Sequence, residues 1–490
     1  MRLCFKGHNE VYAVEQTLMA LLPEERPVYG GDDPNWAGVS LTQEGDRAAA
    51  VTEMHYRGET GRGECARVLS GTEYEREGQR RRLLQMSFFM AARQAAHIAP
   101  PWGSLTGIRP DKVAVQALDA GSSPEEARRL LEEEYFVTPR RARLAAETAA
   151  VTRRLRRELA PRDIALYVGI PFCPTRCAYC SFVSASVEKS FHLVEPYLAA
   201  LKAEIASAGR LCRELGLRVR AFYMGGGTPT TLTAEQMDGL LTVLADSFDF
   251  AACGEYTVEA GRPDTVTAEK LRVLRSHGVD RISVNPQTME DRVLTAIGRR
   301  HSAAQILSAM ELAAAAGFRH INMDLIAGLP EDTPEGFRRS LDACVALGAD
   351  NITVHTLSLK KGSRITLEGL RIPSAEAVGE MLDYADPALR SAGYGPYYLY
   401  RQKYMSGSFE NVGWCRPGSE NLYNVYIMSE LCSILSCGAG GSTKMVGAGP
   451  GSIRRAFNLK YPAEYTARSE KIAENQAAFA AFYREGGALL

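Results

Sequence analysis

Alternating apolar and polar residues predict β-strands in the first part of the chain. The segments RLCFKG, AAVTEMHYRG and GECARVLSG show this alternation, which is typical of a small antiparallel sheet. From Tyr74 onward the apolar positions recur at helical spacing, until Pro100 ends the pattern. Further helices are expected at about 123–135 and 138–159. The pattern therefore predicts that residues 1–160 form an α+β domain with a helical connector.

Near residue 162 the pattern changes to strands that alternate with helices. These strands are expected to begin near Ile164, Val219, Tyr256, Arg281, His320 and Asn351. Strands joined by crossover helices pair in parallel and curl, so six such units predict a partial version of an eight-unit barrel. The expected fold class is therefore α/β, with a partial (βα)6 barrel at residues 161–360.

The chain after residue 360 departs from this repeat. Tyrosines and glycines are dense in GYGPYYLYRQKY and CGAGGSTKMVG, and these segments predict extra strands and loops that close the open side of the barrel. The tail is rich in alanine and charged residues and predicts a terminal helix. We therefore expect a separate C-terminal region at residues 361–490.

Composition narrows the class of protein. The 490 residues carry a formal net charge of −1, which gives no general attraction to nucleic acid or to an anionic membrane. No stretch approaches the ~20 apolar residues of a membrane span, and the first residues lack the apolar core of a signal peptide. An odd number of cysteines, 11, favours a reducing compartment over a disulfide framework. A cytoplasmic location is therefore expected.

Three closely spaced cysteines follow the first predicted strand of the barrel. Cys173, Cys177 and Cys180 stand in a C-x3-C-x2-C spacing within LYVGIPFCPTRCAYC, and thiolates so close on one loop are typical of an iron–sulfur cluster. Zinc sites usually pair two halves of such a motif, and no second half follows here. Three ligands on a four-iron cluster leave one iron open to a substrate or cofactor. The alternative is that these are buried structural cysteines.

Other motifs also follow predicted strands, where parallel α/β folds gather their chemistry. GGGTPT, EAGRP, NPQT and DLIAGLP each occupy such a place, and consecutive glycines let the backbone approach a ligand closely. Glu259, Gln287, Arg299 and Asp324 lie at or just past successive strand ends. A single polar residue there is usually only solvated. Four of them suit a polar ligand with ammonium, carboxylate and ribose groups.

The cysteine loop and the glycine-rich segment together resemble the radical S-adenosylmethionine (SAM) enzymes. With NMDLIAGLPEDT and the interval from Gln287 to Arg299, they resemble more narrowly the oxygen-independent coproporphyrinogen III dehydrogenases, a grouping that also contains haem chaperones. PWGSLTGIRPDK and ENVGWCRPG resemble its longer, HemZ-like subgroup. The resemblance implies that the three cysteines hold a 4Fe–4S cluster. It also implies that these residues lie near SAM: Tyr167, Tyr179, Gly226, Gly227, Thr228, Glu259, Gln287, Arg299 and Asp324.

The same resemblance implies an activity. A 5′-deoxyadenosyl radical derived from SAM would drive the oxidative decarboxylation of coproporphyrinogen III to protoporphyrinogen IX, in porphyrin and haem biosynthesis. A reductant such as flavodoxin or ferredoxin would be a partner. Arg299 could clamp the SAM carboxylate, and Asp324 or Gln287 could hold the ribose hydroxyls. A substrate with four carboxylates needs cations, and the candidates are Arg262, Lys360, Lys361, Arg364, Arg401 and Lys403.

Two departures from the family pattern leave an alternative open. The best-studied dehydrogenases carry a further cysteine two residues after the last ligand, where this chain has Phe182, a departure shared with the chaperones. The chaperones carry a His-Asn pair before a tyrosine, where this chain has Glu420, Asn421, Leu422 and Tyr423. A haem carrier of the same family is therefore the alternative to the enzyme.

Two further hypotheses are disfavoured. The neutral charge and the lack of a basic nucleic-acid module argue against a radical SAM enzyme that acts on RNA. A second cluster could use Cys415, Cys432 and Cys437, but isolated cysteines of this kind are more often small buried hydrophobes.

Overall fold

The computed structural model describes residues 1–180, 185–359, 363–402, 405–449 and 452–487. It divides into two compact units. The first contains Met1–Ala146 together with the short stretch that begins at Arg401, and the second contains Glu147–Tyr400 and the C-terminal part of the chain. Among the residues that the structure describes, no helix has the length and apolar character needed to cross a membrane.

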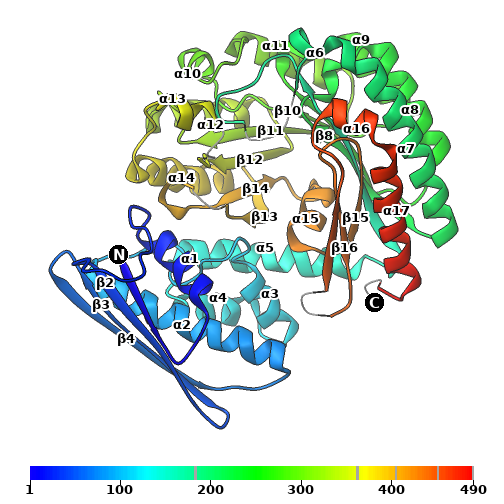
Figure 1. Ribbon diagram of the computed structural model, residues 1–490. Coiled ribbons are helices and arrows are strands. Elements are labelled where there is room, and N and C mark those ends of the chain that lie inside the picture. The colour runs from blue at the N-terminus through cyan, green and yellow to red at the C-terminus, as the bar shows by residue number, and fades with distance from the viewer. Residues whose placement is uncertain (181–184, 360–362, 403–404, 450–451, 488–490) are drawn as a thin grey trace. The chain divides into compact units, whose positions relative to one another are not determined.

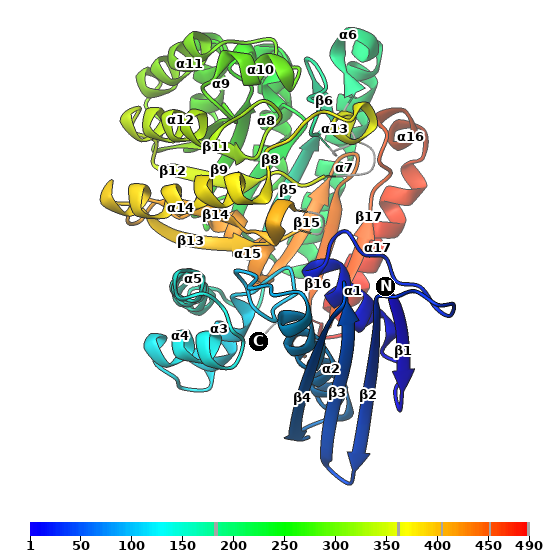
Figure 2. The same ribbon diagram turned by 90° about the vertical axis from the view of Figure 1, so that its left-hand side faces the viewer.

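A four-stranded sheet with the order β1-β2-β3-β4 is the centre of the first unit (Figure 2). Its strands are β1 (Arg2–Lys6), β2 (Trp36–Glu44), β3 (Arg47–Tyr56) and β4 (Glu59–Val68). The last three pair antiparallel, whereas β1 pairs parallel to β2, so the prediction of an antiparallel sheet is wrong at this edge. The reason is helix α1 (Val11–Leu21), which returns the chain to the starting side before β2 begins.

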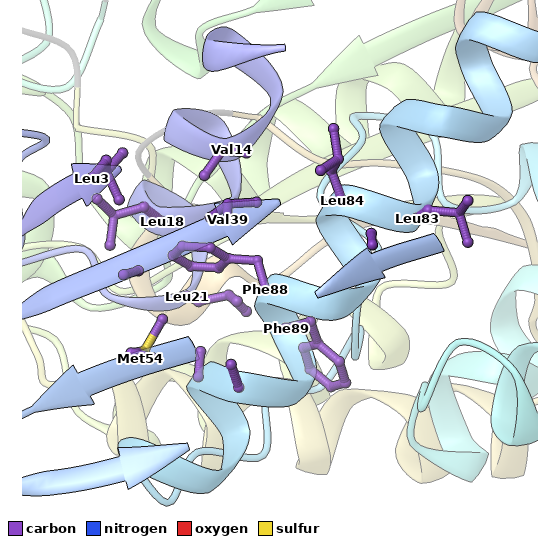
Figure 3. Packing of buried hydrophobic residues seen from close by; sticks show 14 of the residues in the cluster. Leu3, Val14, Leu18, Leu21, Val39, Met54, Leu83, Leu84, Phe88 and Phe89 are labelled. Atoms are coloured by element: carbon purple, nitrogen blue, oxygen red, sulfur yellow. The ribbon is translucent and has the colours of Figure 1, made fainter. Parts of the chain in front are cut away.

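Helix α2 (Glu73–Ala95) packs against this sheet. Thr72 and Glu75 form a reciprocal capping box at its start, which satisfies N–H groups of the first turn. Gly63 of β4 allows close approach, because a Cβ there would lie 2.0 Å from the carbonyl oxygen of Ser87. Figure 3 shows the resulting buried core, which includes Leu3, Val14, Leu18, Leu21, Val39, Met54, Leu84, Phe88 and Phe89.

Three more helices follow α2. They are α3 (Lys112–Asp119), α4 (Pro124–Glu133) and α5 (Pro139–Arg157), and the last two confirm the helices predicted near these positions. Trp102, in the loop before α3, is fully buried. The loop therefore packs through its indole.

Parallel strands form the centre of the second unit, and all six predicted strands are confirmed. They are β5 (Asp163–Ile170), β8 (Arg218–Gly226), β9 (Glu255–Gly261), β10 (Arg281–Val284), β11 (His320–Ala327) and β12 (Asn351–Thr356). Each pairs in parallel with the next in this order. The carboxyl ends of the strands therefore meet at one edge, where the predicted motifs lie.

Helices connect these strands, and Figure 1 shows α7, α8 and α9 along the outer side of the curved sheet. The connecting helices are α7 (Val194–Leu215), α8 (Ala234–Ser247), α9 (Ala268–Ser276), α10 (Asp291–Ala296), α11 (Ala303–Ala315) and α12 (Pro334–Ala346). Short elements in the loops are β6 (Phe172–Cys173), β7 (Ala185–Ser186), α6 (Val187–Ser190) and α13 (Arg364–Glu368). The alternation of strand and helix makes this an α/β fold.

The C-terminal strands lengthen the sheet at both edges. Beyond β12 lie β14 (Asn411–Cys415) and β13 (Gly395–Tyr400), preceded by α14 (Ala375–Ser391); beyond β5 lie β15 (Ser433–Cys437), β16 (Ser442–Val446) and β17 (Ile453–Phe457). The result is an 11-stranded sheet whose end strands are β13 and β17, and these two do not pair among the described residues. The chain ends with α16 (Pro462–Ala467) and α17 (Ser469–Arg484), so the predicted terminal helix is confirmed.

Helix α15 (Leu422–Ser429) fills the inside of the curved sheet (Figure 1). Its first N–H groups, those of Leu422 and Tyr423, donate to the Glu255 carboxylate at 2.8 and 3.3 Å. Glu255 also pairs with Arg281, at 3.2 Å, and the two side chains are 3% and 2% exposed. Arg281 in turn donates to the carbonyl oxygen of Ser419 at 3.0 Å. A buried ion pair thus fixes the helix at the amino ends of the strands.

Candidate functional site

The cysteine loop begins where β5 ends, at the carboxyl edge of the sheet. Cys173 lies in β6, and Cys177 and Cys180 follow on the loop, with Cys177 the most buried of the three. Thr228 directly follows the three consecutive glycines at the end of β8. Its hydroxyl donates to Cys173 Sγ at 3.5 Å. The cysteine loop and the glycine-rich segment therefore meet, as the sequence motifs predict.

Contacts from other strand ends hold this loop in place. The Ala178 N–H donates to the carbonyl oxygen of Ile297 at 2.9 Å. The hydroxyl of Thr175 accepts a hydrogen bond from Arg262 Nη1 at 2.7 Å. Arg262 also forms a bidentate pair with Asp264, with distances of 2.9 and 2.7 Å. The loop is thus anchored by the chain after β9 and by the chain after α10.

Arg262 is therefore not a free cation for a carboxylate substrate, and that prediction is wrong. Its side chain is 2% exposed, and its guanidinium is committed to Asp264 and Thr175. His301 lies on the other side of Asp264, at 3.6 Å. Burial disfavours the Asp264 carboxylate, but the nearby His301 side chain and the hydrogen bonds from Arg262 outweigh this effect and hold the pKa of Asp264 well below its usual range.

Arg299 connects the loop to the end of β10. Its Nη2 donates to the Tyr179 hydroxyl at 3.1 Å, and its Nη1 donates to the carbonyl oxygen of Asn285. Burial disfavours the charge, but the neighbouring Tyr179 and Cys177 outweigh this effect and raise the pKa of Arg299. The buried Nε–H has no hydrogen-bond partner among the described residues. One donor of the guanidinium is therefore left for a ligand.

The consecutive glycines allow the strand after the cysteine loop to approach it closely. The Gly227 N–H donates to the carbonyl oxygen of Ile170 at 2.8 Å, and the Thr228 N–H to that of Phe172 at 2.7 Å. A Cβ on Gly227 would lie 2.5 Å from Phe172 O, and Gly226 has a φ of +107°, which favours glycine. The N–H groups of Gly227 and Thr228 are thus bonded to the backbone of the cysteine loop and of the end of β5.

Glu259 lies beside a stack of tyrosine rings inside the sheet. The Tyr223 hydroxyl donates to its carboxylate, and the Tyr223 ring stacks with Tyr423 at 4.6 Å and with Tyr167 at 6.3 Å. Burial raises the pKa of Glu259 to about 7, and the nearby Asp324 carboxylate adds to the rise, against the Tyr223 hydrogen bond, which lowers it. The interior therefore holds two carboxylates that repel each other.

Gln287 and Asp324 are joined through their backbones. Gln287 has a φ of +68°, which is uncommon for a residue with a side chain, and its N–H donates to Asp324 O at 2.9 Å. The Gln287 side chain is 8% exposed, and its Oε1 has no hydrogen-bond partner among the described residues. Asn322 Nδ2 donates to Asp324 Oδ1 at 2.8 Å. Burial disfavours the Asp324 carboxylate, but the nearby His355 imidazole and the hydrogen bond from Asn322 outweigh this effect and lower the pKa of Asp324.

These residues fit the two groups that the motifs imply. The carboxylates of Glu259 and Asp324, the open donor of Arg299 and the unpaired carboxamide oxygen of Gln287 match a ligand that carries ammonium, carboxylate and hydroxyl groups. Nowhere in the described ranges do three His, Cys, Asp or Glu side chains converge closely enough for one metal ion. A cluster takes each thiolate on a different iron, so three thiols on one loop suit it better than a single ion.

Several residues singled out from the sequence lie elsewhere. Phe182, Lys360, Lys361 and Lys403 fall outside the described residues. Arg364 pairs with Glu368 at 2.7 Å on α13. Arg401 is buried in the first unit, where its N–H donates to the carbonyl oxygen of Ile108 at 2.7 Å. Arg401 is therefore not a cation on the barrel rim.

The three late cysteines are buried among apolar and aromatic neighbours, not gathered as a metal site. Burial raises the pKa of Cys415 and of Cys432 to about 12, and that of Cys437 well above its usual value. Thiols that resist ionisation are poor metal ligands, so the structure favours their interpretation as small hydrophobes.

Sequence reasoning missed Tyr223, Asn322 and His355. Tyr223 is in register with Tyr167, Asn322 lies two residues before Asp324, and His355 lies two residues after Thr353, the partner of Asp324 in the register. The two-residue period of strands could have found Asn322 from Asp324, and Tyr223 from Gly225. No local signal showed that their side chains would meet.

We expect Glu259→Gln to stabilise the ligand-free protein in a pH-dependent way. Because the pKa of Glu259 rises to about 7 on folding, its stabilising protonation is complete below its ordinary pKa and is lost as the pH rises through 7. The neutral glutamine should match the wild type near pH 4 and exceed it by about 3 kcal/mol at pH 8. Urea denaturation at several pH values measures this, with exposed Glu311→Gln as the control. A difference that does not change with pH would contradict the assignment.

Comparison with known proteins agrees with this geometry. Residues 167–344 match the model of the radical SAM superfamily. The crystal structure of coproporphyrinogen III oxidase (HemN) from Escherichia coli shares the fold, with a TM-score of 0.52 and 24% identity over 66% of this chain and 72% of that one. The fold and the site therefore define a radical SAM protein, a class that uses a 4Fe–4S cluster and SAM.

Whole-chain similarity places the protein more narrowly. It is 37% identical to the oxygen-independent coproporphyrinogen-III oxidase-like protein HemZ of Bacillus subtilis, over 90% of each chain. It is also 31% identical to the heme chaperone HemW of Mycobacterium tuberculosis, over 61% of this chain and 73% of that protein. The chain belongs to the radical SAM family of oxygen-independent coproporphyrinogen-III oxidase-like proteins.

Proposed function

We propose that this protein catalyses the oxygen-independent oxidative decarboxylation of coproporphyrinogen III to protoporphyrinogen IX in the cytoplasm. The observation that carries the proposal is the unpaired, buried carboxamide oxygen of Gln287, a residue held in a strained backbone conformation beside the Asp324 backbone. Strain and an unsatisfied polar group are costly, and they are typical of a site built for a ligand. The name of the HemZ relative supports the choice of substrate.

In this proposal the chain divides its residues between two cofactors. Cys173, Cys177 and Cys180 hold the 4Fe–4S cluster, and the cofactors supply the one-electron chemistry when they are bound. Glu259, Gln287, Arg299 and Asp324 bind the polar groups of SAM. The site around SAM is lined by Tyr167, Tyr179, Gly226, Gly227 and Thr228.

The protein's own contribution is orientation and the exclusion of water. The stacked rings of Tyr167, Tyr223 and Tyr423 lie beside Glu259 and shield its carboxylate from water. A carboxylate in such surroundings attracts a cation more strongly than one in water. No disulfide joins any of the 11 cysteines in the described residues, which suits a reducing compartment where flavodoxin or ferredoxin could supply electrons.

The second candidate is a haem carrier of the same family. The observation in its favour is the similarity to HemW, whose name describes a heme chaperone. The site residues alone do not separate the two, because both candidates would use the cysteine loop. An assay of the substrate is therefore needed.

We expect anaerobically reconstituted, reduced protein to release carbon dioxide from coproporphyrinogen III when SAM is present. A tripropionate product should appear before protoporphyrinogen IX, because two propionates react in turn. Formation of 5′-deoxyadenosine should rise several-fold on addition of the substrate. Mass spectrometry of the porphyrins and chromatography of the nucleoside measure these outcomes. The same slow release of 5′-deoxyadenosine with and without substrate, together with a stable haem complex, would favour the carrier.

A further inference from the structure

A line of polar side chains crosses the inner side of the sheet from β11 to β13. Asp324 Oδ2 lies 3.9 Å from His355 Nε2, and His355 Nδ1 lies 3.3 Å from the Tyr400 hydroxyl. The three residues come from neighbouring regions of the sheet, and the His355 and Tyr400 rings meet edge to face. This arrangement of carboxylate, imidazole and phenol was not evident from the sequence, and its members His355 and Tyr400 have no part in the proposed contacts to SAM.

The contacts around His355 and Asp324 show which carboxylate oxygen the imidazole can reach. The flanking Val354 and Thr356 are buried in the strand, whereas the His355 side chain is 26% exposed. Asp324 Oδ1 already accepts from Asn322 Nδ2, and Asn322 donates in turn to the hydroxyl of Ser283 at 2.9 Å. Only Oδ2 of the carboxylate faces the imidazole. Asp324 Oδ1 is therefore bonded to Asn322, and Asp324 Oδ2 faces His355.

The direction of the hydrogen bond between the Tyr400 hydroxyl and His355 Nδ1 is linked to which nitrogen of His355 carries the proton. When the phenol O–H donates to Nδ1, the neutral ring carries its proton on Nε2, which points to the carboxylate. At 3.9 Å this contact is longer than a hydrogen bond. Contacts of this kind are often long in ligand-free proteins and shorten when the ligand orders the site.

We propose that His355 is a positioning residue for Asp324: its Nε2–H, set by Tyr400, holds the carboxylate in the orientation that receives the ribose hydroxyls of SAM. The proposal rests on the assignment of Asp324 to the SAM site. Residues of β12 and β13 would then orient the adenosine half of SAM, from the end of the sheet where β13 is the last strand.

The test compares His355→Phe, His355→Gln and Tyr400→Phe in protein with a reconstituted cluster. We expect His355→Phe to raise the Kd for SAM about tenfold, because a hydrogen bond to a charged group contributes about 1.5 kcal/mol. His355→Gln keeps an N–H donor and should stay within about threefold of the wild type, and Tyr400→Phe should weaken binding about threefold. Competition with 5′-deoxyadenosine should weaken in the same order, whereas competition with methionine should change less than twofold.

A double-mutant cycle with Asp324→Ala separates positioning from a general structural effect. Once Asp324 is absent, His355→Phe should cause no further loss of SAM affinity. His320→Phe, which removes a histidine from the amino end of β11, is the matched control and should leave binding unchanged. Additive losses, or an equal loss of methionine binding, would overturn the proposal.

Different results would refute the proposed function and the role of His355. If the wild type with a full cluster does not bind SAM, the proposed function fails. If the wild type binds SAM and Asp324→Ala weakens it, but His355→Phe binds as tightly as the wild type, only the role of His355 is refuted. Iron content and absorption of the cluster, measured on each variant, show that the proteins compared are equally loaded.

Discussion

Serine in place of Cys173, Cys177 and Cys180 together is expected to abolish iron–sulfur cluster binding. A serine hydroxyl stays protonated at neutral pH and is a poor ligand for iron, whereas thiolates are the usual ligands of such clusters. Anaerobic reconstitution followed by iron and sulfide analysis measures the loss. The expected iron content of the triple variant is near zero, against about four irons in the wild type.

The loop's own contacts make this result interpretable. Arg262 holds Thr175, and the Ala178 N–H donates to Ile297, so the loop should keep its fold when the thiols are replaced. Circular dichroism and the urea midpoint should therefore change little. Cys4→Ser, at an exposed position in the first unit, is the control and should load a full cluster. Full iron content in the triple variant would instead direct attention to Cys415, Cys432 and Cys437.

Arg281→Ala is expected to be strongly destabilising, with a cost of about 3–5 kcal/mol in the free energy of unfolding. The substitution leaves the Glu255 carboxylate buried without its partner, under the first turn of α15. It also removes the donor to Ser419 O. Urea denaturation measures the cost, and hydrogen exchange of peptides from β9, β10 and α15 shows where the protein opens.

Two companion variants test the cause. Arg281→Ala combined with Glu255→Gln should recover part of the stability, because the double variant no longer buries an unpaired charge. The Arg339 side chain is 62% exposed and forms a bidentate ion pair with Glu290. Arg339→Ala should therefore lower the free energy of unfolding by less than about 1 kcal/mol. A cost of Arg281→Ala as small as that of Arg339→Ala would show that the buried pair does not fix α15.

Much of the second unit could be predicted from local patterns. The strand periodicity located β5, β8, β9, β10, β11 and β12, because each is a short apolar run followed by a helical period. The cysteine spacing and the glycines after β8 predicted that two loops would meet at one edge, and Thr228 does contact Cys173 there. These features depend on neighbours in the chain or on the general rule that parallel strands share one active edge.

Other features depended on partners that are distant in the sequence. Arg262 carries the positive charge that a carboxylate substrate needs, but its guanidinium is bonded to Asp264 and Thr175. The direction of β1 depends on the crossover through α1, which its alternation of apolar residues does not encode. The C-terminal strands add to both edges of the sheet, since a strand's pattern states only that it will pair, and not with which neighbour.

The sequence by itself determined the class of this protein: a parallel α/β sheet with a cysteine loop at its carboxyl edge. Only the tertiary structure decided which side chains meet inside it, such as Tyr223 with Glu259 and His355 with Asp324. The physical reason is that periodicity and motif spacing report the short-range geometry of the backbone. The pairing of buried polar groups depends instead on strand order and register, which the whole fold sets at once.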